Sequence, residues 1–284
     1  MTDVLRLAAF TSDPAGGNPA GVVLDAGGLD DAAMLAIAAE VGYAETAFVT
    51  STRADEEGLR CGIRYFSPVA GVPFCGHATV ATAVVLAERD GPGRLAFDTP
   101  VGEVAITTAP GPDGIEASFT SVEPAVESLD GPLLAQLLGM LALTEADLDP
   151  ELPPRIAFAG NRHPVVVVSD VAALDRVAFD PAAMRALMDA QRWEATVAVV
   201  HRRNAAEFEV RNVFPVGAIV EDPATGAAAA ALGAYLRDAG AVAPPADVVI
   251  HQGRHVGRPS LLRVHVPEFG GITVSGTAVA IPTP

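Results

Sequence analysis

The sequence contains no lysine, and all 18 of its basic residues are arginine. A pyridoxal phosphate Schiff base, a lysine nucleophile and a P-loop each require a lysine side chain, so this absence excludes all three. No glycine-rich nucleotide fingerprint follows a predicted strand, which removes the usual signal for nicotinamide or flavin binding. We therefore expect chemistry without a cofactor.

Cysteine and positive charge are also scarce. The two cysteines, Cys61 and Cys75, do not make a disulfide framework. The formal net charge of −17 argues against a nucleic-acid partner, because no basic patch stands out against it. The chain has no run of 18 apolar residues and no secretory signal near its start, so we expect no membrane partner and a cytoplasmic location.

The 284 residues, half of them hydrophobic, suffice for two domains that each bury a core. Proline, glutamate and serine replace the strand pattern over residues 120–132. This composition shift predicts a boundary near residue 121, with domains at 1–121 and 122–284, and the last strand is free to return to the first domain.

Two similar proline segments organise the chain. The first runs from Phe66 to Thr79 (FSPVAGVPFCGHAT) and the second from Phe214 to Gly226 (FPVGAIVEDPATG). In each, a small reactive side chain, Cys75 or Asp222, stands seven residues after the first proline, and an alanine-rich helix is predicted next, over 77–88 and 227–237.

A second pair of similar stretches indicates an internal repeat. Gly17-Asn18 precedes its counterpart Gly160-Asn161 by 143 residues, close to the 147 that separate the proline segments. Predicted strands surround the alanine-rich helix in both halves. Other predicted elements are a helix that Asp30 or Asp31 caps and Gly42 ends, a helix over 181–191, a strand over 207–213, a hairpin turn over 53–57, and a turn-rich loop over 11–21 that contains Asn18. The predicted fold class is α+β, with two similar domains, each a barrel-like mixed sheet around a central helix, and the chemistry in a cleft where they face each other.

The starts of the two helices are suited to an anionic ligand. Unpaired backbone N–H groups and a partial positive charge are expected at Gly76-His77 and at Thr225-Gly226. Two such helix starts facing one another would hold a small anion, so we expect a small anionic substrate as the partner.

Glu45 is the predicted acid/base. In the strand expected over 45–50, Glu45, Ala47 and Val49 share one face, which predicts partial desolvation of the carboxyl and a raised pKa. Such a group can take and return a proton near neutral pH. The alternative is an edge glutamate that points to solvent.

The residues at the helix starts allow several roles. A thiol at Cys75 can have its pKa lowered by the helix dipole, whereas His77 tends to stay neutral in the same field. Asp222 precedes Pro223, so turn formation or helix capping is its structural alternative.

One arrangement superficially resembles a metal motif. His251 and His255 have the spacing of a zinc helix, but Gln252 replaces the usual glutamate and Gly253 interrupts the segment. Flanking valines predict a strand and a turn there, so we expect no metal site.

Five segments together resemble the PhzF-like family of phenazine-biosynthesis isomerases. They are GNPAG at 17–21, ETAF at 45–48, PFCGHAT at 73–79, EDPATG at 221–226 and GRPS at 257–260. The resemblance covers most of the chain. It implies a fold similar to diaminopimelate epimerase, with two pseudo-twofold related domains, and usually a homodimer.

The resemblance also implies residue roles. Glu45 would be the acid/base, with His77 and Asp222 as its helpers. Gly76 and Asp222 would stand where the related epimerases keep two catalytic cysteines. Substrate binding would fall to Asn18, Gly76, Thr225 and Gly226. The chain departs from the pattern at Ala227, where the resembling motif often has serine.

We therefore expect a cofactor-independent isomerase or epimerase that moves a proton on a small carboxylate-bearing substrate. Two alternatives stay open. One is a two-base amino-acid racemase or epimerase that uses Cys75, and the other is a non-catalytic ligand-binding protein on the same fold. If Glu45 works alone, replacing Cys75 by alanine should be nearly silent.

Overall fold

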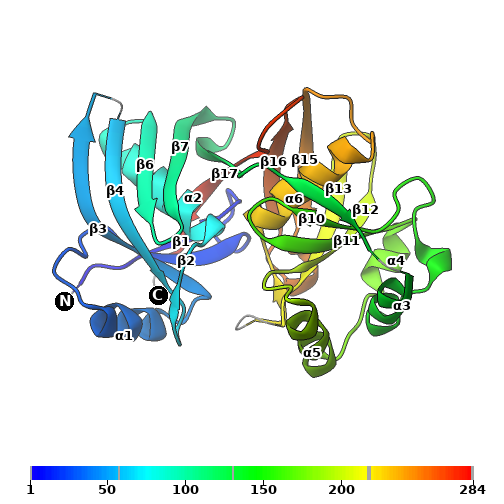
Figure 1. The fold of residues 1–284 in the computed structure, drawn as a ribbon. Coiled ribbons are helices and arrows are strands. Elements are labelled where there is room, and N and C mark those ends of the chain that lie inside the picture. Colours follow the sequence, from blue (N-terminus) through cyan, green and yellow to red (C-terminus); the bar gives the residue numbers. More distant parts are fainter. Residues whose placement is uncertain (1, 57, 130, 216–218, 283–284) are drawn as a thin grey trace. The chain divides into compact units, whose positions relative to one another are not determined.

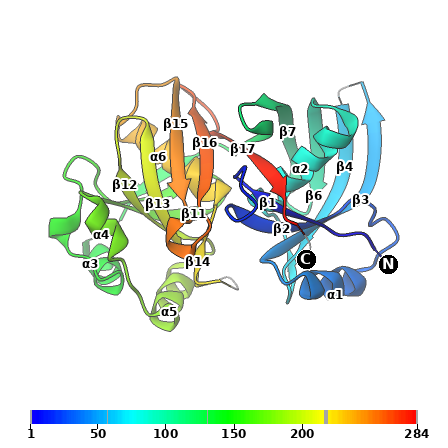
Figure 2. The ribbon, with the colours of Figure 1, turned by 180° about the vertical axis from the view of Figure 1, so that it is seen from behind.

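The structure, a computed structural model, describes residues 2–56, 58–129, 131–215 and 219–282. Its internal contacts divide the chain into two units. One comprises Met1–Thr120 together with Ser275–Pro284, and the other comprises Ser121–Val274. The chain therefore returns to the first unit through its final strand, which Figure 2 shows in red beside β1.

A closed ring of eight strands forms the first unit (Figure 1). Following the pairing, the strands are β1 (Leu5–Ala9), β2 (Asn18–Val23), β3 (Glu45–Asp55), β4 (Gly58–Phe66), β6 (Arg94–Thr99), β7 (Gly102–Gly111), β8 (Gly114–Thr120) and β17 (Thr273–Ala280), which pairs with β1 again. The β2–β3 and β4–β6 pairs are parallel, so the sheet is mixed. The two-residue strand β5 (Gly71–Val72) pairs with the end of β4.

Helix α2 (Gly76–Asp90) lies inside this ring, where it contacts β1, β2, β3, β7 and β8. Its alanines and threonines leave little side-chain bulk, which is why strands can approach it on several sides. Helix α1 (Asp31–Val41) packs instead on the other face of β3, in a cluster with Phe48 and Phe66. Asp30 caps α1 through the Ala33 N–H, and Gly42 ends it, as the sequence predicts.

The second unit is a seven-stranded mixed sheet that curves around helix α6 (Gly226–Asp238). Helix α6 contacts the two edge strands of the sheet and the two strands that follow the first edge strand. Its order is β9 (Ala125–Ser128), β10 (Arg155–Phe158), β11 (Arg162–Val168), β12 (Val197–Arg202), β13 (Glu207–Val213), β15 (Ala246–Gln252) and β16 (Ser260–Val266). The short strand β14 (Glu221–Asp222) pairs with β13.

Three further helices cover part of this sheet: α3 (Gly131–Met140), α4 (Val171–Asp175) and α5 (Pro181–Gln191). They enclose a core cluster that includes the fully buried Trp193 together with valines of β11 and β12. Two 3-10 turns, at Glu145–Asp147 and Arg254–Val256, complete the unit. No helix in the described ranges is both long and apolar enough to cross a membrane.

The two units repeat one order of elements. β1, β2, α1, β3, β4, β5, α2, β6 and β7 correspond to β10, β11, α5, β12, β13, β14, α6, β15 and β16. The parallel pairs fall at corresponding places, β2–β3 with β11–β12 and β4–β6 with β13–β15. The predicted fold class is therefore confirmed: two similar units, each a curved mixed sheet around a central helix.

Some local predictions are wrong. The turn expected over 53–57 begins too early, because Arg53, Ala54 and Asp55 continue β3 in register with Gly58–Arg60 of β4. Asn18 is the first residue of β2 and pairs with Ala9, whereas the sequence places it in a loop. Strand β9 and helix α4 were not predicted, since both are too short for a periodic pattern.

Candidate active site

Strand register decides which residues of the two proline segments correspond. Val72 pairs with Tyr65 in one unit as Asp222 pairs with Asn212 in the other, and each pair of strands leads directly into the buried helix. Cys75 is the N-cap residue of α2, and Thr225 is the N-cap residue of α6. The predicted equivalence of Cys75 with Asp222 is therefore wrong: Thr225 corresponds to Cys75. Val216, Gly217 and Ala218 of the second segment lie outside the described residues.

The start of α2 brings three reactive side chains together. The Cys75 thiol donates to Glu45 Oε2 over 3.6 Å, and His77 Nε2 lies 3.5 Å from the same oxygen. The Cys75 sulfur is 3.4 Å from His77 Nδ1 and 3.7 Å from Nε2. The side chain of Glu45 is only 17% exposed and that of His77 only 7%. A carboxyl, an imidazole and a thiol therefore share one small, nearly dry volume.

Strand β2 positions the imidazole. Asn18 Nδ2 lies 3.2 Å from His77 Nδ1, and the backbone carbonyl of Pro19 accepts a hydrogen bond from the ring. β2 reaches α2 this closely because the preceding loop turns tightly at Gly17, whose φ is +65° and where a Cβ would lie 2.4 Å from Thr11 Cγ2. Asn18, predicted to bind substrate, is thus fully buried against the ring.

Burial sets the protonation of both titratable groups. Desolvation raises the pKa of the Glu45 carboxyl, and the hydrogen bond from Cys75 partly opposes this rise. Desolvation lowers the pKa of His77 to about 4, against which the hydrogen bond to Pro19 acts weakly. The imidazole is therefore neutral at neutral pH, and the carboxyl can change its protonation state closer to neutrality than an exposed glutamate.

Hydrogen bonds on the far side of the cluster hold Cys75. Its carbonyl accepts from the Thr79 hydroxyl over 2.8 Å, and that hydroxyl lies 2.6 Å from the Tyr65 hydroxyl. Both Tyr65 and Thr79 are buried. The first turn of α2 is thus anchored to β4, which holds the thiol, the Gly76 N–H and the imidazole in one place.

The start of α6 carries a second polar centre. Asp222 Oδ2 accepts from the Thr225 hydroxyl over 2.6 Å. Gln252, at the end of β15, donates to the Asp222 carbonyl over 2.6 Å and accepts from the Thr225 N–H over 3.2 Å. Sequence reasoning missed Gln252, although it lies in a segment that was weighed for metal binding. Gly226, the first helical residue, is buried in the same turn.

A buried ion pair supports this centre. Both terminal oxygens of Glu221, the neighbour of Asp222 in β14, accept hydrogen bonds from Arg211, the shortest at 2.7 Å. Arg211 also donates to the carbonyls of Leu174 and Val177 in and after α4. The guanidinium therefore ties β14 to β13 and to α4, and fixes the backbone that carries Asp222.

The histidine pair of the apparent zinc motif does not converge. His251 lies in β15 and His255 in the following 3-10 turn, as a strand and a turn predict. His251 pairs with Glu207, whereas His255 pairs with Asp175. Within the described part of the chain, the grouping with metal-ligand geometry is Glu45, Cys75 and His77. Sequence analysis did not consider this set.

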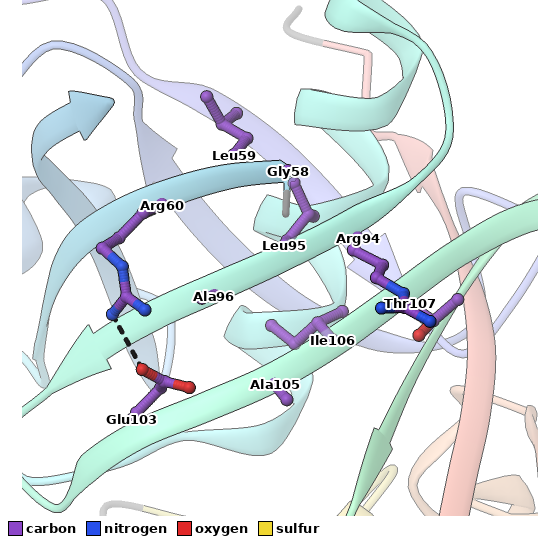
Figure 3. A pocket seen from close by; sticks show the side chains of 10 residues that line it. All are labelled: Gly58, Leu59, Arg60, Arg94, Leu95, Ala96, Glu103, Ala105, Ile106 and Thr107. Carbon is purple, nitrogen blue, oxygen red and sulfur yellow. Dashed lines mark ion pairs between the residues drawn. The ribbon is translucent and has the colours of Figure 1, made fainter. Parts of the chain in front are cut away.

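A pocket of about 350 Å³ lies elsewhere on the first unit (Figure 3). It is lined by residues of β4, β6 and β7, among them Arg60 and Glu103, which form an ion pair over 2.8 Å. None of the predicted site residues lines it. Its walls offer neither a nucleophile nor a buried acid, so it has no part in the site described above.

Comparison with known proteins supplies the class. The chain is 34% identical to the uncharacterized isomerase YddE of Escherichia coli (strain K12), over 98% of this chain and 96% of that protein. It is 31% identical to the trans-2,3-dihydro-3-hydroxyanthranilate isomerase of Pseudomonas chlororaphis, over 95% and 94% of the two chains. The crystal structure of a PhzF-family phenazine biosynthesis protein from Bacillus anthracis superposes with a TM-score of 0.86 at 27% identity, covering 99% of this chain and 97% of that one.

The fold and these relatives define an isomerase. More narrowly, the sequence of residues 7–283 matches the family of phenazine biosynthesis-like proteins, PhzC-PhzF, and the chain belongs to this family. The resemblance carried by the five sequence segments is thereby confirmed.

Proposed function

We propose that this isomerase works without a cofactor and moves a proton on a small carboxylate-bearing substrate, with Glu45 as the acid/base. Glu45 removes a proton from a carbon next to a carboxylate or an unsaturated system, and the electron pair left behind delocalises into that system. The same carboxyl then returns the proton to another carbon on the face that it contacts, which makes the reaction an isomerisation. An epimerisation would in addition need a proton donor on the opposite face of the same carbon.

The observation that carries the proposal is the buried carboxyl beside a neutral imidazole and a thiol. Desolvation raises the pKa of Glu45 toward the range in which one group both accepts and donates a proton. His77 is neutral, and in the tautomer that carries its single proton on Nε2 it can donate a hydrogen bond to the carboxylate, 3.5 Å away, after the substrate proton has been returned. The backbone N–H groups at the start of α2 favour the carboxylate of the substrate and the charge that builds up.

Geometry speaks against Glu45 and Cys75 as the two bases of a racemase. Two bases that invert a carbon stand on opposite faces of it, each at about 3 Å, so roughly 6 Å must separate them. Cys75 Sγ and Glu45 Oε2 are only 3.6 Å apart. The other helix start offers Thr225 in place of a thiol, and the second cysteine, Cys61, is buried within β4 of the first unit.

The second centre is proposed to assist the same reaction. Asp222 is presented with its carboxylate oriented by Thr225, and the adjacent N–H groups of α6 repeat the anion-binding arrangement of α2. We assign Asp222 a helper role and Thr225 and Gly226 a substrate-binding role. Trans-2,3-dihydro-3-hydroxyanthranilate, for which a relative is named, has the required carboxylate and ring unsaturation and is the first compound to test.

This proposal can be tested with protein that has been treated with a chelator and desalted. Two substrate sets are compared: trans-2,3-dihydro-3-hydroxyanthranilate, followed by its ultraviolet spectrum, and a panel of single amino-acid enantiomers, followed by chiral chromatography. We expect a spectral change without racemisation. Racemisation of an amino acid by Cys75-dependent chemistry, with the ring compound untouched, would instead support a two-base enzyme.

The pH dependence of the reaction should report on the Cys75 hydrogen bond. Glu45 must be ionised to accept a proton, so kcat/KM falls as the pH drops through the raised pKa of its carboxyl. The thiol hydrogen bond lowers that pKa, so Cys75→Ala should move the acid limb of the profile to higher pH. At a pH well above the acid limb, Cys75→Ala should change the activity little, as the sequence analysis predicts for this variant. A loss of ~10²-fold there would show that the thiol transfers protons itself.

A further inference from the structure

We propose that Glu45, Cys75 and His77 form a binding site for one thiophilic divalent cation, of which Zn²⁺ is the probe, and that the bound cation inhibits the isomerase. The inhibitory part rests on the proposed function of Glu45, whereas the binding part does not.

The distances among the three ligand atoms match a zinc site. Glu45 Oε2 is 3.6 Å from Cys75 Sγ, Cys75 Sγ is 3.7 Å from His77 Nε2, and His77 Nε2 is 3.5 Å from Glu45 Oε2. In a tetrahedral site, zinc bonds to sulfur, nitrogen and oxygen of ordinary length separate these atom pairs by about 3.6, 3.6 and 3.4 Å respectively. The sulfur also lies 3.4 Å from His77 Nδ1, whereas an imidazole that binds zinc through Nε2 keeps the other ligand atoms more than about 5 Å from Nδ1. The three ligand atoms are therefore close enough to share one ion once the His77 ring turns to direct Nε2 at it.

The ligand types and their surroundings agree with this assignment. Thiolate, imidazole and carboxylate together form a donor set that suits Zn²⁺ and disfavours Mg²⁺ or Ca²⁺, which prefer oxygen ligands. Three protein ligands leave the fourth position open to water or to a carboxylate. The formal net charge of −17 raises the concentration of cations near the protein.

An outer partner for the imidazole is in place. A histidine that binds a metal through Nε2 usually donates from Nδ1 to an oxygen. The side-chain amide of Asn18 lies 3.2 Å from His77 Nδ1, and a half-turn of that amide presents its oxygen as the acceptor. Coordination would occupy the oxygen of Glu45 that otherwise takes the proton, so substrate deprotonation would stop.

Direct binding is measured with Co²⁺ as a spectroscopic substitute and Zn²⁺ as the competitor, without substrate. We expect one equivalent of Co²⁺ to give a thiolate-to-metal charge-transfer band, which Zn²⁺ removes by displacement. Cys75→Ser should abolish the band and weaken Zn²⁺ binding by more than the ~10-fold to 100-fold typical of losing an outer partner. Glu45→Gln, as a second variant, should weaken binding while keeping the band.

Cys61→Ala is the matched control, because Cys61 is the other thiol of the chain and lies in the core of the first unit, outside the cluster. It should bind both metals like the wild type. Circular dichroism establishes that each variant is folded. Absence of the band in folded wild type, or equal Zn²⁺ binding by wild type and Cys75→Ser, overturns the site.

Inhibition is then measured separately on any substrate that the wild type turns over. Equimolar Zn²⁺ should stop turnover and a chelator should restore it. If Zn²⁺ occupies the cluster by the Co²⁺ competition test but turnover continues, the inhibition is refuted while the site stands. If wild type binds metal but turns over none of the tested carboxylates, the proposed function fails and the metal site does not.

Discussion

Glu45→Gln should lower kcat by at least ~10²-fold while substrate affinity largely survives. The amide keeps the size of the side chain and can still accept from the Cys75 thiol, but it cannot take up a proton. The measurement is steady-state kinetics together with calorimetric binding of the substrate to the variant. A fall in affinity that alone accounts for the lost activity would make Glu45 a binding residue.

Glu40→Gln provides the matched control, since it makes the same chemical change at an exposed position on α1 of the same unit. Its kinetics should equal those of the wild type. If both variants lose activity alike, the loss reflects the charge of the protein and not the chemistry of Glu45.

Arg211→Met should destabilise the second unit by about 3–5 kcal/mol, because it leaves the Glu221 carboxylate buried without its partner. Both side chains are at most 10% exposed, and the guanidinium also satisfies the carbonyls of Leu174 and Val177. Urea unfolding, followed by the fluorescence of Trp193 in the same unit, measures the effect. The same substitution should also lower activity, since Glu221 adjoins Asp222.

Arg185→Met is the corresponding control. Arg185 pairs with Asp189 one helical turn away in α5, and both side chains are about half exposed. Such a pair contributes roughly 0.3–0.5 kcal/mol, so the urea midpoint should hardly move. Equal effects of the two substitutions would mean that burial of the Arg211 pair has no special energetic weight.

The fold was predictable where the sequence carries periodicity or clear end signals. Helix α1 has Asp30 and Gly42 at its ends, and the predicted bounds of α5 and β13 agree with the structure. The strand alternation also indicated that Glu45 is desolvated, because a carboxyl aligned with Ala47 faces the interior of a barrel. Strands β5 and β14 have two residues each, and an element of two residues is too short to be predicted from a periodic sequence pattern.

The misaligned repeat has a simple physical origin. Counting from the first proline of each segment assumes loops of equal length. Yet Val72 pairs with the residue seven positions before it, whereas Asp222 pairs with the residue ten positions before it. The longer loop is visible only in the pairing of β14 with β13. With that pairing, Thr225 and not Asp222 is the residue of the second unit that corresponds to Cys75.

Side-chain contacts between residues far apart in the sequence could not be predicted either. Gln252 meets Asp222 and Thr225 across about thirty residues of sequence, and the same separation divides Glu45 from Cys75. Sequence spacing predicts which residues share a helix face or a strand face. It does not predict which strand end lies against which helix start, so neither the supporting role of Gln252 nor the three-ligand cluster could be foreseen.

The central claim is that Glu45 alone carries the proton, and transfer of deuterium from solvent tests it most directly. Wild type and Glu45→Gln, both treated with a chelator, are incubated in D₂O with trans-2,3-dihydro-3-hydroxyanthranilate, and the recovered substrate and product are analysed by mass spectrometry and NMR. Wild type should introduce deuterium at the carbon that receives the proton, and the variant should introduce none. Substantial incorporation by Glu45→Gln would contradict the account and move the base to His77, Cys75 or Asp222.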